Sequence, residues 1–136
     1  MSRVVVLLAL VLVAARPAVA QVSGGDRLVM FEEKSCSYCV VWDRRVGTIY
    51  AKTDEARKLP LRRVELNVSR PADLRSIKNV HVAPTFVVMH CGREFQRITG
   101  YIGEDQFWGL LDAALHSLEA GTAQTRSPKP SSGCKA

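Results

Sequence analysis

The chain has 136 residues and a formal net charge of +6. Most of that excess comes from basic residues near the two ends of the chain, namely Arg3, Arg16, Arg126, Lys129 and Lys135. Residues 21–121 are therefore close to neutral, which argues against a nucleic-acid-binding domain, because such a domain needs a clustered basic surface.

Residues 1–20 have the pattern of a secretory signal peptide. A short basic start, Met1-Ser2-Arg3, precedes an apolar run and the small-residue cleavage pattern Ala18-Val19-Ala20. The apolar run is too short to span a bilayer comfortably, so we expect no stable membrane insertion of the mature chain. We predict export to an oxidising compartment, where disulfides persist. The Ala-rich and Arg-rich composition favours a bacterium, and hence the periplasm.

The first strand and the first helix follow the leader. Leu28 to Phe31 is apolar on both faces, which is typical of a strand buried in a parallel or mixed sheet. An amphipathic helix is predicted from about Ser37 to Tyr50, with an extension to Lys58 left open, and Pro60 marks its end.

A Cys-x-x-Cys motif joins this strand to this helix. Cys36 falls at the helix N-terminus, where unpaired N–H groups favour a thiolate, and Lys34 adds a positive charge. Cys39 belongs to an apolar stripe at helical spacing, which it shares with Trp42, Val46 and Ile49. Residues three apart on a helix are close enough for a disulfide. The motif therefore predicts dithiol–disulfide exchange, in which Cys36 attacks and Cys39 resolves.

Three further strands and a short helix are predicted next. Leu61 to Val68 alternates apolar and polar residues as a strand does, and Pro71 to Lys78 is compatible with a short helix. Strands follow at Thr85 to Met89 and at Glu94 to Thr99, joined by a tight turn at Cys91-Gly92-Arg93. The doublets Arg44-Arg45 and Arg62-Arg63 are interpreted as solvated positions on a helix and on a strand edge.

The last helix has the clearest pattern. Glu104 and Asp105 place negative charge in its first turn, and Gly121 is a candidate for its C-terminal cap. Its apolar stripe comprises Phe107, Leu110, Leu111, Ala114 and Leu118. Residues 122–136 show no apolar periodicity and are predicted to be a disordered tail. The element order predicts an α/β fold whose first two strands are parallel and whose last two are antiparallel.

A structural disulfide and a metal site are the alternatives to exchange chemistry. A disulfide that closes so short a loop stabilises the fold little, because it constrains the unfolded chain little. Candidate soft ligands for copper or zinc are Cys36, Cys39, Cys91, His81 and His90. The chain has no second motif at ligand spacing, so we predict no metal and no other cofactor. A copper-binding or metal-binding module remains the alternative class.

Cys91 and Cys134 form the remaining pair of cysteines. A second disulfide, a mixed disulfide with a partner and two idle thiols are all open. Idle thiols are the favoured interpretation.

The order of these features resembles the thioredoxin superfamily. The resemblance covers about residues 26–120 and includes the Cys-x-x-Cys motif, the proline of Ala83-Pro84-Thr85 and the final hairpin and helix. It implies a thioredoxin-like four-stranded mixed sheet flanked by helices, in a domain at residues 21–121, and thiol-disulfide oxidoreductase activity. It also implies that Pro84 is cis and that backbone groups at Ala83 and Thr85 receive an extended substrate. Tyr38 is predicted to be exposed and to line the partner-binding surface.

A narrower set of motifs is similar to the SoxS-type periplasmic thioredoxins of bacterial thiosulfate-oxidising (Sox) systems. These motifs are Phe31-Glu32, Cys36-x-Tyr38-Cys39-x-x-Trp42, Pro84-Thr85-Phe86, Gly92-Arg93-Glu94, and Gly100-Tyr101 with Phe107-Trp108 after it. The likeness implies a protein that reduces a cysteine or disulfide of a partner in the periplasm, with a Sox carrier protein as one partner and a membrane electron donor upstream. We expect the mature chain to be a monomer. Lys34-Ser35 and Ser37 depart from the usual motif, so the redox potential and the direction of exchange stay open.

Two further positions depart from ordinary thioredoxins. Met30 stands where those proteins carry a buried Asp, and Glu65 stands where a lysine is often paired with it. Glu65 is a candidate proton acceptor for Cys39, because proton transfer needs a titratable group within hydrogen-bond reach. The alternative is that Glu65 lies on the solvated side of its strand.

Overall fold

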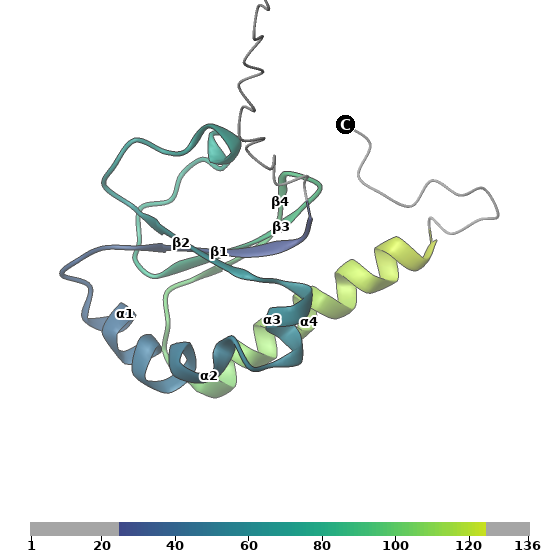
Figure 1. Cartoon of the computed structure of the whole chain (residues 1–136), viewed down its shortest axis with the longest axis horizontal. Coiled ribbons are helices and arrows are strands. Elements are labelled where there is room, and N and C mark those ends of the chain that lie inside the picture. The colour runs from purple at the N-terminus through teal and green to yellow at the C-terminus, as the bar shows by residue number, and fades with distance from the viewer. Residues whose placement is uncertain (1–24, 125–136) are drawn as a thin grey trace, which may run out of the picture.

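The structure is a computed structural model that describes the backbone of residues 25–124 and the side chains of residues 25–121 (Figure 1). The predicted signal peptide at residues 1–20 and most of the predicted tail lie outside the described residues. Within residues 25–124, no helix is long and apolar enough to cross a membrane.

Four strands form one mixed sheet in the order β2-β1-β3-β4. The strands are β1 (Arg27–Glu32), β2 (Leu61–Glu65), β3 (Thr85–His90) and β4 (Arg93–Thr99). β1 is parallel to β2 and antiparallel to β3, and β3 and β4 form an antiparallel hairpin. The predicted mixed sheet is confirmed. β2 ends at Glu65 rather than at Val68, because Asn67 and Ser69 favour a turn.

The first helical run is continuous but changes its winding. It comprises α1 (Ser37–Trp42), the π-helical turn η1 (Asp43–Gly47) and α2 (Thr48–Tyr50). A π turn holds more residues than an α turn and so rotates all that follows it about the helix axis. Tyr50 is therefore 1% exposed, whereas Ile49 is 45% exposed. The prediction that Ile49 belongs to the buried stripe is wrong for this reason.

The first helical run does not extend to Lys58, because the helix is interrupted after Tyr50. The separate helix α3 (Asp54–Lys58) begins after Thr53, whose Oγ1 accepts a hydrogen bond from the Ala56 N–H at 3.2 Å. This side-chain cap satisfies an N–H that has no partner within the helix, so a new helix starts there.

Two other helix predictions need correction. The predicted helix from Pro71 to Lys78 is only a 3₁₀ turn, η2 (Ala72–Leu74), and the chain is non-helical by Asn79, whose φ is 56°. The last helix, α4 (Glu104–Gln124), continues past Gly121. One glycine inside a helix costs only about 1 kcal/mol, so good neighbours can carry the helix through it.

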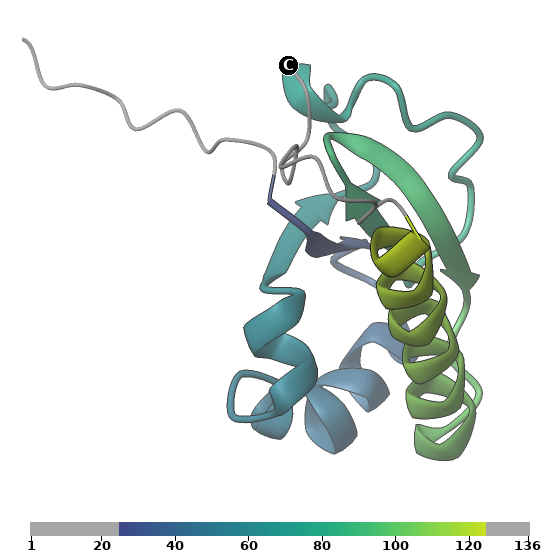
Figure 2. The ribbon, with the colours of Figure 1, turned by 90° about the vertical axis from the view of Figure 1, so that its right-hand side faces the viewer.

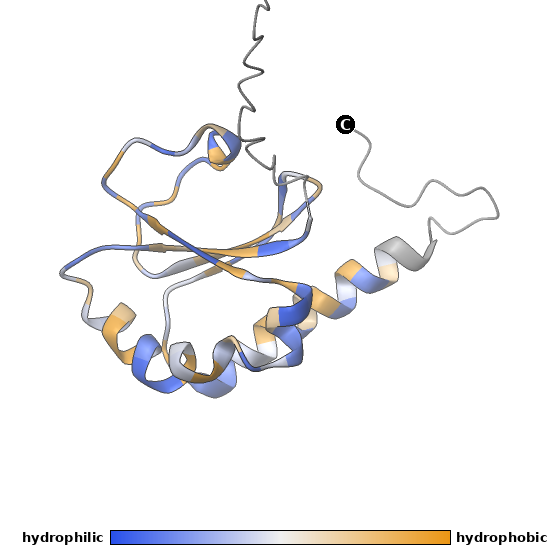
Figure 3. Cartoon of the chain, in the orientation of Figure 1, coloured by the Kyte–Doolittle hydropathy of each residue, from blue (hydrophilic) through white to orange (hydrophobic). Residues whose placement is uncertain are grey.

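The sheet has a helix-covered face and a loop-covered face. Figures 1 and 2 show α1 to α4 on one side and residues 66–84, which include η2, on the other. The helix face buries a large cluster that includes Leu28, Met30, Trp42, Phe86 and Phe107. The loop face buries a smaller one that includes Val29, Phe31, Leu74, Ile77 and Val87. The covering helices carry hydrophobic and hydrophilic residues together, as amphipathic helices do (Figure 3).

Candidate active site

The two motif cysteines are joined in a disulfide at the N-terminus of the first helical run. Cys36 is the N-cap residue of α1, and its Sγ accepts a hydrogen bond from the Cys39 N–H at 3.0 Å. Cys36 is partly exposed, whereas Cys39 is 4% exposed. The structure therefore has the predicted asymmetry, with one sulfur open to a partner and the other sheltered. In the reduced protein, the same N–H would stabilise a Cys36 thiolate.

The Pro84 loop lies at the same end of the sheet. The Ala83–Pro84 peptide bond is cis, as the resemblance implied. Because Phe31 pairs with Thr85, the end of β1 that leads to Cys36 lies beside the start of β3. The Pro84 carbonyl accepts a hydrogen bond from the Gly100 N–H at 2.8 Å, and Thr85 is 1% exposed within the sheet. Substrate binding by backbone groups near Ala83 and Thr85 remains a prediction.

Tyr38 lies on the surface beside Cys36. It is 60% exposed and borders a shallow groove of about 320 Å³ between α1 and the start of α4. The other residues that line the groove are Val41, Arg45, Tyr101, Ile102, Gly103 and Glu104. Ile102 is 82% exposed, so the groove has an apolar edge next to the redox motif. The predicted exposure of Tyr38 is confirmed, and its contact with a partner remains a prediction.

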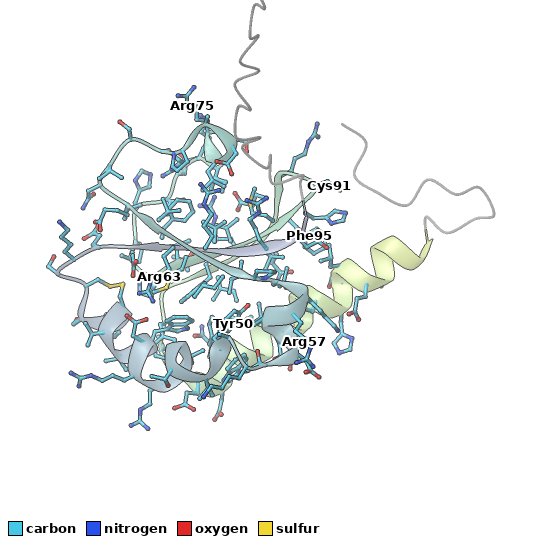
Figure 4. The ribbon with its side chains drawn as sticks, in the orientation of Figure 1. Tyr50, Arg57, Arg63, Arg75, Cys91 and Phe95 are labelled. Carbon is cyan, nitrogen blue, oxygen red and sulfur yellow. A yellow bond between two sulfur atoms is a disulfide. The ribbon has the colours of Figure 1, made fainter. Side chains whose placement is uncertain are left out.

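Arg63 contacts acidic residues on both sides of the segment from Glu33 to Trp42, which contains the two motif cysteines. The sequence did not predict this role. The Arg63 guanidinium donates hydrogen bonds to Glu32 Oε1 at 2.9 Å and to Asp43 Oδ1 and Oδ2 at 2.7 and 2.9 Å. It also lies 6.0 Å from the ring centroid of Trp42. The bonds to Glu32, and then those to Asp43, raise the pKa of Arg63 above its ordinary value. Figure 4 labels Arg63 near the disulfide.

This ion-pair cluster fixes the position of the motif. Glu32 is the last residue of β1, and Asp43 follows the last residue of α1. The segment from Glu33 to Trp42 therefore begins and ends beside residues that share one guanidinium on β2. Charge pattern predicted a solvated strand position for Arg63, but it carries no information about which acids Arg63 meets.

Glu65 follows Arg63 on the same face of β2 and pairs in register with Glu32. It is partly buried. Proton transfer between Glu65 and Cys39 remains a prediction.

The candidate metal ligands do not form a cluster among the described residues. Cys36 and Cys39 are bonded to each other, and His90 and Cys91 lie at the other end of β3. Among residues 25–121, no three His, Cys, Asp or Glu side chains are grouped to hold a metal ion. Cys91 is itself disulfide-bonded, so the interpretation of Cys91 as an idle thiol is wrong. Cys134 lies outside the described residues.

The fold and the site together define a class of protein. A half-exposed disulfide at a helix N-terminus, beside a cis-proline loop on a mixed sheet, is built for dithiol–disulfide exchange. A model of the thioredoxin-like domain matches residues 14–115. The chain belongs to the thioredoxin-like family, and it is a thiol-disulfide oxidoreductase.

Two solved structures show how near the resemblance is. The periplasmic thioredoxin SoxS from Paracoccus pantotrophus, in its reduced form, is 38% identical, with a TM-score of 0.65. The match covers 68% of this chain and 98% of that one. A thioredoxin from Malassezia sympodialis is 18% identical with a TM-score of 0.52, over 69% of this chain and 80% of that one, and so supports the fold alone. A search of curated proteins found no match.

Proposed function

We propose that this chain is exported to the periplasm and reduces a disulfide or an oxidised cysteine of a partner protein there. The observation that carries the proposal is the Cys36–Cys39 disulfide, with Cys36 partly exposed and Cys39 buried. The pattern of residues 1–20 and the similarity to a periplasmic SoxS thioredoxin support the compartment. The same similarity makes a carrier protein of the Sox system the partner of choice.

The reaction follows from the placement of the two sulfurs. In the reduced chain, the Cys36 thiolate attacks one sulfur of the partner disulfide, and the other partner sulfur leaves with the electron pair and takes a proton. The Cys39 thiolate then attacks Cys36 Sγ, which closes the disulfide seen here and releases the second partner sulfur. An upstream membrane donor must supply two electrons to reopen the Cys36–Cys39 bond for the next cycle.

Substitution of each motif cysteine tests the assigned roles. Cys36→Ser should abolish reduction of a disulfide-containing partner, whereas Cys39→Ser should accumulate a mixed disulfide through Cys36, visible by mass spectrometry without reductant. Ser76→Ala is the matched control, because Ser76 is exposed in the loop that covers the other face of the sheet and takes part in neither step. Full reductase activity in Cys36→Ser would show that the roles are wrongly assigned.

The direction of exchange is tested by the reduction potential of the Cys36/Cys39 couple. Proteins with this motif range from about −270 mV for a reductant to about −120 mV for a disulfide donor. The proposal expects a value nearer the lower limit. A value near the upper limit would make the chain a disulfide donor instead.

A further inference from the structure

A second group of reactive side chains lies in the β3–β4 hairpin, at the opposite end of the sheet from the Cys36–Cys39 disulfide. Figure 4 labels Cys91 and Phe95 there, far from Arg63. Cys91 and Gly92 form the turn, with φ values of 51° and 73°. Two positive φ values are typical of a type I′ turn, whose first position favours Asn, Asp or Gly. A cysteine is unusual at this position, because side chains are crowded there.

His90 connects the Cys91 sulfur to a carboxylate. Its Nδ1 lies 2.6 Å from Asp26 Oδ1, and its Nε2 lies 3.4 Å from Cys91 Sγ. An imidazolium carries a proton on each nitrogen, so it can donate to the carboxylate and to the sulfur together. The imidazole of His90 therefore lies between the Cys91 sulfur and the Asp26 carboxylate. The same order of groups occurs in sites where an acid orients a histidine that activates a cysteine.

Solvent reaches this group. The side chains of His90 and Asp26 are 33% and 30% exposed, and Cys91 is partly exposed. A disulfide whose only purpose was to fasten the chain would gain nothing from an oriented imidazole at one of its sulfurs. By contrast, a disulfide that opens does gain, because a better-stabilised thiolate leaves faster.

We propose that the Cys91 disulfide is a second thiol–disulfide exchange site, separate from Cys36 and Cys39. In it, His90 acts as the acid for the departing Cys91 sulfur, and Asp26 orients His90. The reductant is an external dithiol. This site goes beyond the proposed function, because it uses a different disulfide at the other end of the sheet.

The electrons and protons balance in two steps. One thiolate of the dithiol attacks the sulfur bonded to Cys91, so a new S–S bond forms as the old one breaks. The electron pair leaves on Cys91 Sγ, which takes the proton from His90 Nε2. The second thiol of the reductant then breaks the mixed disulfide, so the reductant departs as a disulfide and two protein thiols remain.

Three side chains from other positions face His90. Asp26 precedes β1, Arg93 lies opposite His90 in the hairpin register, and the Phe95 ring lies 6.3 Å away. Of these side-chain types, only the imidazole changes its charge between about pH 5 and 8. Only the protonated imidazole can supply a proton to the departing sulfur, so assistance by His90 should weaken as pH rises.

The parent protein for the test is the full chain with Cys36→Ser and Cys39→Ser. Because this variant lacks both motif sulfurs, the Cys36–Cys39 pair cannot pass electrons to Cys91. The result is therefore independent of the proposed function. Dithiothreitol is added, and alkylation followed by peptide mass spectrometry reports the rate at which Cys91 becomes a thiol. His90→Gln should slow this reaction about tenfold at about pH 6, with the difference vanishing near about pH 9. Asp26→Asn should slow it less, with the same pH dependence. His116→Gln is the matched control, because His116 is exposed on α4.

Three results would overturn the proposal. They are equal rates for His90→Gln and its parent at every pH, a slowing that is the same at every pH, and a peptide map in which Cys91 of the untreated protein is already a thiol. His90→Asn and circular dichroism keep the test valid if His90→Gln unfolds the hairpin. A folded His90→Asn protein that reacts as fast as its parent would count against the proposal equally.

Discussion

The two faces of the sheet are covered in different ways, and only one of them carries the redox motif. On the helix face, Trp42 packs against Phe86 and Phe107, with ring centroids 5.1 and 5.6 Å apart. On the loop face, Leu74 in the 3₁₀ turn η2 and Ile77 after it pack against the sheet. A long helical cover with an aromatic core can hold two sulfurs in fixed geometry. The loop cover closes the core from the other side, and only its last residues, at the cis Ala83–Pro84 bond, belong to the site.

The same contrast appears within two adjacent residues. Arg62 and Arg63 follow each other on β2 and therefore point to opposite faces. Arg63 binds Glu32 and Asp43 beside the motif, whereas Arg62 binds Asp73 in η2. The helix-face arginine contacts both ends of the redox segment. Arg62 contacts only the loop that covers the other face, through Asp73.

The largest expected effect comes from truncating the core on each face. Trp42→Ala should lower the free energy of unfolding by about 3–5 kcal/mol, and Ile77→Ala by about 2–4 kcal/mol, because each leaves a cavity in a fully buried site. Chemical denaturation measures both. Only Trp42→Ala should also slow disulfide exchange, since Trp42 lies one turn from Cys39. Equal effects of both variants on exchange would remove the distinction between the faces. Trp42→Phe serves if the alanine variant does not fold.

A smaller effect is expected from the arginine pair. Arg63→Met should cost about 1 kcal/mol of stability, since the cluster is partly solvated, and Arg62→Met about 0.5 kcal/mol or less. Loss of the Arg63 charge disfavours a thiolate near Glu32 and Asp43, so the reduction potential should fall by roughly 10–30 mV. Arg62→Met is the matched control and should leave the potential unchanged. A shift of the same size in both variants would assign the effect to overall charge.

At neutral pH, Tyr50→Phe should cost about as much stability as Arg63→Met, and its distinguishing effect is on the pH dependence of stability. The buried Tyr50 hydroxyl donates to the Leu59 carbonyl at 2.8 Å, and its loss should cost about 1 kcal/mol. Burial, and then the charge of Glu55, raise the pKa of Tyr50 above its ordinary value of 10.0. Above that pH the unfolded chain loses the proton while the folded chain keeps it, so stability should fall as pH rises. Thermal unfolding from about pH 8 to 11 should show a steeper fall for the parent than for Tyr50→Phe.

Local patterns predicted the framework of the fold and the close pair of sulfurs at Cys36 and Cys39. The apolar run of β1, the alternation before the hairpin and the stripe of α4 each specify an element without reference to the rest of the chain. Cys36 and Cys39 were found from their spacing and from the helix that begins between them. In each case, the decisive information lies within a few residues of sequence.

The missed features depend on contacts between distant segments. Glu32, Asp43 and Arg63 come from three different elements, so no local pattern brings them together. The π turn is equally invisible, because the apolar spacing from Cys39 to Val46 fits an ordinary helix. The bond at Cys91 requires a partner that turn chemistry alone does not identify.

The π turn between Asp43 and Gly47 also separates the two halves of the first helical run. A Cβ on Gly47 would lie 2.9 Å from Asp43 Oδ1 and 3.1 Å from the Trp42 ring, so a side chain at this position would have to displace both. The turn thus sets the angular phase of α2 independently of α1. A larger residue at position 47 would press on the Asp43 carboxylate that Arg63 binds, so this glycine links the winding of the helix to the ion-pair cluster.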